Sequence, residues 1–169
     1  MMCEFLINDY TRRGYINGFS LRFPTISVRP GKPTAAASSF ISGVIREPMA
    51  GKECIVPLKD REWSHWMCSP KTLVFNLKVA LGLERDSLPG HRRSINMPGF
   101  RVTVQDMLDA LEEVGGKDKL RFVREEDDEA VKKILYSWGD DYDNKLALSL
   151  GMKQDKSFVD SVRDYVDGL

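Results

Sequence analysis

Two segments of the sequence combine residue types that could hold a small ligand. The first, RPGKPT at residues 29–34, brings together Pro30, Gly31 and Lys32 between an expected strand and an expected helix. Small residues let a ligand approach the backbone closely, and the N-terminus of a helix attracts an anion. The candidate ligand-contacting residues that follow are Ala36, Ala37, Ser38 and Ser39. The alternative is a tight connection between strand and helix that binds nothing.

The second segment, WMCSPK at residues 66–71, also joins the end of an expected strand to a helix. Ser69 followed by Pro70 is a typical helix start, with a capping hydroxyl and a proline at the first helical position. Trp63 and Trp66 could line a substrate pocket by stacking, or they could pack inside the core. The sequence leaves both alternatives open.

The motifs of a complete enzyme are not found in this sequence. It has no GxGxxG or GxxGxxG turn for a dinucleotide, and no tyrosine is followed by a lysine four residues later. His65 and His91 stand far apart, so we interpret them as structural or surface residues and expect no metal site. Asp140, Asp141 and Asp143 lack the glycine and the glutamate of a calcium loop, which predicts a solvated turn.

The composition is that of an ordinary globular domain. The 169 residues include 25 basic and 25 acidic side chains, so no overall field recruits nucleic acid or an anionic membrane. Three scattered cysteines give no disulfide framework. We find no secretory signal and no run of about 20 apolar residues, which favours a cytoplasmic protein without a membrane span.

Alternating helical and extended patterns predict an α/β fold. A helix is expected over residues 2–13, with Cys3, Leu6, Ile7 and Tyr10 on one face, and Pro24 predicts an edge position or an irregularity in a strand over residues 20–28. Further helices are expected near residues 39–48, 69–81, 103–114, 130–138, 144–150 and 157–166, and further strands at 54–58, 63–68, 93–97 and 120–124.

Several stretches taken together resemble the extended short-chain dehydrogenase/reductase family, also known as the NAD-dependent epimerase/dehydratase family. They are CEFLINDYTRRG at residues 3–14, SLRFPTISVRPGKPTAAASSFISGVIREP at 20–48, WMCSP at 66–70, SINMPGFRVTVQDMLDALEEVGG at 94–116 and LALSLGM at 146–152. The most similar group is D-erythronate dehydrogenase-like, and the resemblance covers essentially the whole chain.

This resemblance implies the C-terminal part of a protein with an NAD-binding Rossmann domain and a smaller substrate-binding domain. Residues 1–35 would be a remnant of the former and residues 36–169 would be the latter. The family's catalytic pair is YxxxK, often with a glutamate four residues after the lysine. If Glu4 is that glutamate, the sequence begins one residue after the catalytic lysine.

The resemblance also implies roles for the two segments. Pro30, Gly31 and Lys32 match the loop beside the nicotinamide, and Lys32 replaces an asparagine common in sugar-nucleotide epimerases, which suits a small acid substrate. The residues expected to face the substrate are Ala36, Ala37, Ser38, Ser39, Trp66 and Ser69.

We therefore expect a truncated NAD-dependent oxidoreductase that is inactive alone, because the glycine-rich motif and the catalytic pair lie outside the sequence. Complete relatives would use NAD and a small sugar-acid or sugar substrate, and this chain alone would not bind the cofactor. One alternative is a non-catalytic interaction module that forms a homodimer or pairs with a full-length subunit. Another is a small-ligand binder that uses only the pocket at residues 36–39.

Overall fold

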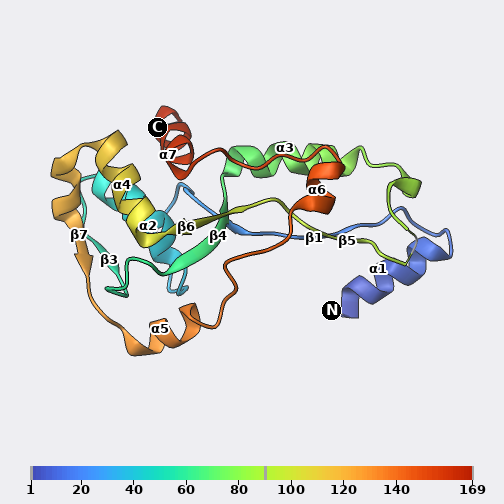
Figure 1. The fold of residues 1–169 in the computed structure, drawn as a ribbon, viewed down its shortest axis with the longest axis horizontal. Coiled ribbons are helices and arrows are strands. Elements are labelled where there is room, and N and C mark those ends of the chain that lie inside the picture. Colours follow the sequence, from blue (N-terminus) through green and yellow to red (C-terminus); the bar gives the residue numbers. More distant parts are fainter. Residues whose placement is uncertain (1, 90, 169) are drawn as a thin grey trace.

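Helices and short strands alternate along the chain in the computed structural model, which describes residues 2–89 and 91–168. The helices are α1 (Met2–Arg12), α2 (Ser39–Met49), α3 (Pro70–Leu81), α4 (Val104–Gly115), α5 (Glu129–Leu135), α6 (Lys145–Ser149) and α7 (Phe158–Asp167), with 3-10 helices η1 (Arg85–Ser87) and η2 (Lys117–Phe122). The strands are β1 (Ser20–Arg22), β2 (Thr25–Ile26), β3 (Cys54–Val56), β4 (Ser64–Cys68), β5 (Ser94–Asn96), β6 (Phe100–Thr103) and β7 (Val123–Glu125). Figure 1 shows α2 and α4 at one end of the elongated molecule and α1 at the other.

The strands form three small sheets. β1 pairs in parallel with β5, and β3 pairs in parallel with β7. β2 pairs in parallel with β4, which pairs antiparallel with β6. The expected α/β fold is therefore confirmed, and its sheets are small, with both parallel and antiparallel pairing.

Two extended segments are each interrupted near a proline, and in both the strands before and after the break lie in different sheets. The strand expected over residues 20–28 is interrupted at Phe23 and Pro24, so that β1 and β2 lie in different sheets. Pro24 has no N–H to donate to a ladder, which accounts for the irregularity. Met97, Pro98 and Gly99 separate β5 from β6 in the same way. Because β1 pairs with β5 and β4 joins β2 to β6, both breaks lie between the same two sheets.

One expectation for an individual strand was wrong, and one strand was not expected. A strand is expected over residues 120–124, but the chain forms η2 and β7 begins only at Val123. Gly116, at φ +88°, ends α4 and leads directly into η2, which delays the strand. The sequence also gives no signal for β6, since Pro98 and Gly99 stand just before it and Thr103 caps the following helix.

Side-chain caps mark the start of some helices but not of all. Ser69 caps α3 as expected, because its Oγ accepts a hydrogen bond from the Thr72 backbone N–H at 3.1 Å. Thr103 and Asp106 form a reciprocal capping box at α4. Ser38 occupies the N-cap position of α2, but its side chain makes no capping hydrogen bond there.

Two hydrophobic clusters form separate cores. The large core packs α2 and α4 against β3, β4 and β6, and its most buried members include Ile41, Val44, Ile45, Val56, Leu58, Val104, Met107 and Leu111. The small core lies beneath α3 and consists of Ala80, Leu88, Ile95, Met97, Ala147 and Met152, with Phe19, Leu21, Leu73 and Leu77 packed against it. Val74 and Leu81, which helical periodicity predicts to be buried, are exposed because only one narrow stripe of α3 faces this core.

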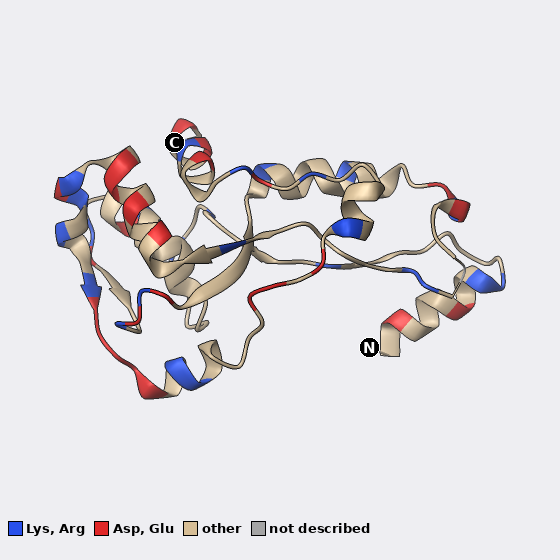
Figure 2. Cartoon of the chain, viewed as in Figure 1, with Lys and Arg blue, Asp and Glu red and all other residues tan. Residues whose placement is uncertain are grey.

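Charged residues are distributed unevenly over the helices (Figure 2). Acidic residues Asp106, Asp109, Glu112 and Glu113 run along α4 opposite the side that fills the large core. By contrast, α3 carries only Lys71 and Lys78. Among the described residues, no helix has the length and apolarity that crossing a lipid bilayer requires.

The apolar side chains of α1 remain uncovered in this structure. Met2 is 78% exposed, Phe5 64% and Leu6 55%, and Tyr10 is also exposed. Polar contacts attach the helix to its neighbours, since Glu4 binds Arg22 in β1. Within the described residues, β1 has a strand partner on one edge only.

Candidate functional site

A cavity of about 530 Å³ lies where the two proline-containing breaks meet. Its lining comes from four separate stretches of sequence and consists of Arg22, Phe23, Pro24, Thr25, His65, Trp66, Asn96, Met97, Ser137, Trp138, Gly139 and Tyr142. The breaks and the strand ends beside them supply residues 22–25 and 96–97. β4 supplies His65 and Trp66, and the segment after α5 supplies the rest. We call this space the junction cavity.

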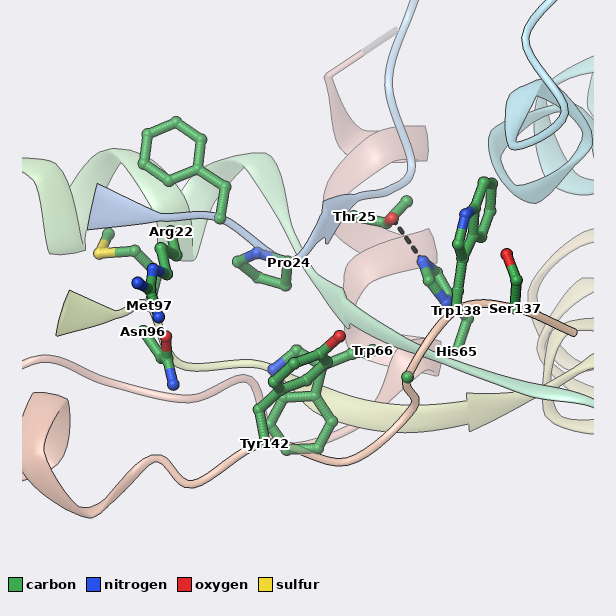
Figure 3. A pocket seen from close by; sticks show the side chains of 12 residues that line it. Arg22, Pro24, Thr25, His65, Trp66, Asn96, Met97, Ser137, Trp138 and Tyr142 are labelled. Atoms are coloured by element: carbon green, nitrogen blue, oxygen red, sulfur yellow. Dashed lines mark hydrogen bonds between the residues drawn. The ribbon is translucent and has the colours of Figure 1, made fainter. Parts of the chain in front are cut away.

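The junction cavity contains one close polar pair (Figure 3). His65 Nε2 lies 2.7 Å from Thr25 Oγ1, across the parallel pairing of β4 with β2. The imidazole is stacked on Trp63, with ring centroids 5.6 Å apart and an interplanar angle of 11°, and Trp138 packs on it at 5.1 Å. Burial lowers the pKa of His65, although the nearby Asp140 carboxylate acts in the opposite direction. The imidazole is therefore neutral at pH 7.

Aromatic rings form the wall opposite this pair. Tyr142 meets the edge of Trp66, with centroids 5.9 Å apart and planes at 62° (Figure 3). Trp138, which packs on His65, adds an aromatic ring on the side of the pair. Aromatic faces pack against the C–H groups of a ligand, while hydroxyl and amide groups such as those of Thr25 and Asn96 orient it.

Residues 136–144, which we call the strap, are held over the cavity by contacts at the first residue and in the middle of the segment. The Tyr136 hydroxyl donates to Asp60 Oδ2 at 2.5 Å. Asp140 accepts a short hydrogen bond from the Ser64 hydroxyl and forms a 3.2 Å ion pair with Arg101. The Ser64 hydroxyl, with help from Arg101, holds the pKa of Asp140 below its usual value. These contacts place Trp138 and Tyr142 at the cavity.

Arg22 is the cationic group at the border of the junction cavity. Its Nε and Nη2 atoms donate to the two carboxylate oxygens of Glu4, at 2.7 and 2.8 Å. The guanidinium is thereby oriented by α1, and more than half of its side chain stays accessible. A bidentate guanidinium contact of this kind fixes geometry as well as charge.

Of the residues expected from the sequence to bind a ligand, Trp66 lies in the junction cavity. Pro30 and Ser69 instead line a second cavity of about 400 Å³, between the start of α3 and α7. Ser69 is almost fully buried, and its hydroxyl donates to Asp155 Oδ1 at 2.6 Å while capping α3. Its hydrogen bonds are thus used within the protein.

The remaining expected residues lie outside the junction cavity. Gly31, Lys32 and Ala36 are exposed, and Ala37, Ser38 and Ser39 are half-buried at the start of α2. Gly31 has φ +114°, a conformation that glycine adopts readily, and a methyl group there would meet no neighbouring atom. Ser39 Oγ accepts a hydrogen bond from the Thr34 backbone N–H at 2.9 Å, which closes the loop on itself.

Sequence reasoning missed most of the residues that line the junction cavity, notably Thr25, His65, Asn96 and Tyr142. His65 is interpreted from the sequence as a structural residue, and its neighbours Thr25 and Trp138 lie far away in the chain. The available signal was Pro24, because a proline inside a strand marks a break where side chains can turn toward a ligand. Among the described residues, no group of three or more histidine, cysteine, aspartate or glutamate side chains is arranged to hold a metal ion.

No protein-family model matches the sequence. Curated relatives do: the D-erythronate dehydrogenase of Haemophilus influenzae is 44% identical over 167 residues, which are 98% of this chain and 52% of the relative. The D-erythronate dehydrogenase of Cupriavidus necator is 42% identical over 164 residues, which are 97% of this chain and 50% of the relative. The chain thus spans about half the length of the curated relatives it matches.

A solved structure agrees with these relatives. The nucleoside-diphosphate-sugar epimerase from Agrobacterium tumefaciens superimposes with a TM-score of 0.93 at 34% identity, covering 98% of this chain and 48% of that one. The chain is therefore a homologue of these dehydrogenases and of this epimerase, and it corresponds to about half of their length. The resemblance to D-erythronate dehydrogenase-like members of the extended short-chain dehydrogenase/reductase family, read from the sequence, is confirmed over about half of the relatives' length.

Proposed function

We propose that residues 1–169 are the substrate-side part of an NAD-dependent dehydrogenase for a small sugar acid such as D-erythronate. The observation that carries this proposal is the junction cavity, which combines a hydroxyl, a neutral imidazole, an amide and aromatic walls in a homologue of D-erythronate dehydrogenases. Hydroxyl and amide groups suit a polyhydroxylated ligand, and Arg22 at the border suits its carboxylate.

The described residues do not themselves fit a dinucleotide. The loop that contains Pro30, Gly31 and Lys32 is exposed, so by itself it offers a dinucleotide no enclosed site. The sequence offers neither a glycine-rich turn nor a YxxxK pair. We therefore assign NAD binding and hydride transfer to a cofactor-binding segment outside residues 1–169, and binding and orientation of the substrate to this chain.

We propose further that residues 1–35 are a remnant of the Rossmann domain and that residues 36–169 are the substrate-binding part. The junction cavity takes residues from both parts, since Thr25 lies before position 35 and His65 after it. Pro30, Gly31 and Lys32 remain the proposed contacts to the cofactor's nicotinamide side when that segment is present. The half-buried residues 36–39 remain secondary candidates for the substrate.

A reconstitution experiment tests this function. Residues 1–169 are assayed for D-erythronate-dependent NADH formation, alone and with the separately expressed cofactor-binding half of the H. influenzae D-erythronate dehydrogenase. We expect no turnover by either piece alone and measurable turnover by the mixture. Turnover by residues 1–169 alone would overturn the assignment of roles. A mixture that forms a complex but oxidises no sugar acid would overturn the proposed substrate class.

A second function is favoured by the uncovered face of α1, namely pairing with a full-length subunit. Leaving four large apolar side chains exposed forgoes on the order of 6–12 kcal/mol of hydrophobic stabilisation, so a partner that covers them would be strongly stabilising. Co-expression with a full-length D-erythronate dehydrogenase should yield a co-purifying complex. Leu6→Asp on α1 should abolish it, whereas Leu148→Asp, at an exposed position on α6, should not. Co-purification that Leu6→Asp leaves unchanged would exclude this face.

A further inference from the structure

The Thr25–His65 pair in the junction cavity contains an atom without a partner. Nε2 of His65 makes the 2.7 Å contact with Thr25 Oγ1, while Nδ1 is buried and has no hydrogen-bond partner among the described residues. The side chain is only 8% exposed, so water cannot readily satisfy that nitrogen. The pair is therefore constrained in how its hydrogens are arranged.

Only two arrangements of the neutral imidazole are possible. If Nδ1 carries the hydrogen, a buried N–H donor is left without an acceptor, which native proteins avoid most strongly. If Nε2 carries it, Nε2–H donates to Thr25 Oγ1 and Nδ1 keeps only an unpaired lone pair. The second arrangement is favoured because an unsatisfied acceptor is tolerated better than an unsatisfied donor.

This tautomer determines what Thr25 offers to the cavity. Its oxygen is occupied by the hydrogen from His65, and the hydroxyl hydrogen is engaged by no other described residue. Thr25 is half-buried and lines the cavity, so that hydrogen is available to an acceptor placed there. Stacking on Trp63 and the tilted contact with Trp138 fix the imidazole plane, and hence the direction of the donor.

We propose that Thr25 donates a hydrogen bond to a carboxylate or hydroxyl oxygen of the ligand, and that His65 is the positioning residue that orients this hydroxyl. The inference rests on the proposed function, because it assigns a contact within the same cavity. The inference goes beyond the proposed function because it gives His65 a role that acts through Thr25, as a fixed neutral donor. His65 itself does not accept a proton from the ligand in this scheme.

Nuclear magnetic resonance can read the tautomer directly, because the chain has only two histidines and His91 is exposed. Long-range ¹H–¹⁵N spectra of the full chain at about pH 7.5 should show His65 as the neutral Nε2–H form, whose pKa lies below that of an unperturbed histidine, about 6.5. His91 serves as the internal reference. Finding His65 as the Nδ1–H form would overturn the inference.

Binding measurements complete the test, with D-erythronate as the probe in calorimetric titrations of the full chain. Thr25→Val, which keeps the shape and removes the hydroxyl, should weaken binding by about tenfold, and Thr25→Ser should stay within about threefold. His65→Phe should also weaken binding, whereas His91→Phe should leave it unchanged. Folding of each variant is checked by circular dichroism.

The outcomes separate the two proposals. Wild-type binding that Thr25→Val leaves unaltered overturns the Thr25 inference and leaves the proposed function standing. Absence of D-erythronate binding by the wild-type chain overturns the substrate class, and with it the ligand that we assign to Thr25.

Discussion

The side-chain amide of Asn144 binds both sides of the Gly99 backbone: its Nδ2 donates to the Gly99 carbonyl at 2.8 Å, and its Oδ1 accepts from the Gly99 N–H at 3.3 Å. Gly99 belongs to the break between β5 and β6, and Asn144 ends the strap. This double contact therefore joins two parts of the junction cavity's frame that lie 45 residues apart in sequence.

Gly99→Ala should destabilise the protein. A methyl group at Gly99 would lie 2.5 Å from Trp66 Nε1 and 2.8 Å from the Met67 carbonyl oxygen, closer than side chains approach such atoms. The expected loss is about 1–3 kcal/mol in the free energy of unfolding, measured by urea titration, with a change in tryptophan fluorescence. Gly82→Ala is the control, since its nearest neighbours would be 3.6 and 3.8 Å away. Equal midpoints for both variants would contradict the packing described around Trp66.

Arg93→Met should be strongly destabilising, because Arg93 is fully buried and donates to backbone oxygens rather than to a carboxylate. Its guanidinium binds the carbonyls of Gly18, Arg85 and Leu88 and the side chain of Asn17, and it lies 4.1 Å from the centre of the Phe19 ring. Removing it leaves several buried acceptors unsatisfied, at a cost of about 2–4 kcal/mol.

The matched control for this variant is Arg92→Met. Arg92 is the exposed neighbour in sequence, and its replacement should change the free energy of unfolding by less than about 0.5 kcal/mol. Thermal denaturation followed by circular dichroism compares the two. If both variants unfold at the wild-type temperature, the hydrogen bonds of Arg93 do not hold this region together.

His65 should make the protein less stable in mild acid. Because burial lowers its pKa in the folded state, the unfolded chain binds more protons than the folded chain between the two pKa values. The His65 contribution is therefore intact above the unfolded value of about 6.5, and it is lost as the pH falls below it. Urea midpoints measured between about pH 7.5 and about pH 5 should fall less steeply for His65→Gln than for the wild type. An identical slope would show that His65 titrates normally.

Of the three cysteines, only Cys3 should react quickly with a thiol reagent. Cys3 is exposed, whereas Cys54 and Cys68 are buried and burial raises the pKa of each thiol to about 12. Because the thiolate is the reactive form, the buried pair should react only after unfolding. Counting modified thiols by mass spectrometry checks this, with Cys3→Ser as the control that removes the fast reaction. A second fast thiol in that variant would contradict the burial.

The sequence predicted elements with local signals and missed those set by distant neighbours. Ser69 caps α3 as expected, and Thr103 caps α4 in the same way, because a capping hydroxyl acts within one turn. Leu81 fits the helical periodicity and yet is 88% exposed. Periodicity predicts the face of the helix on which a side chain lies, but not whether another element packs against that face.

The candidate site was less predictable than the fold for the same reason. Trp66 was expected to contact a ligand, but Thr25 and His65 become neighbours only through the pairing of β2 with β4. The strap residues Trp138 and Tyr142 arrive from more than 70 residues further along the chain, and the contact of Asp140 with Ser64 holds them there. Contacts of this kind have no local pattern.

Pro24 and Pro98 each stand where the chain passes from the sheet beside the small core to the sheet beside the large core. A rotation of one core against the other about these crossings would change the width of the space between them. A molecule that contacts both cores restrains this rotation. Binding of that molecule and restriction of the rotation therefore favour each other. A substitution that makes either crossing more rigid should therefore raise the affinity for a molecule that contacts both cores, even if the substituted residue does not contact that molecule.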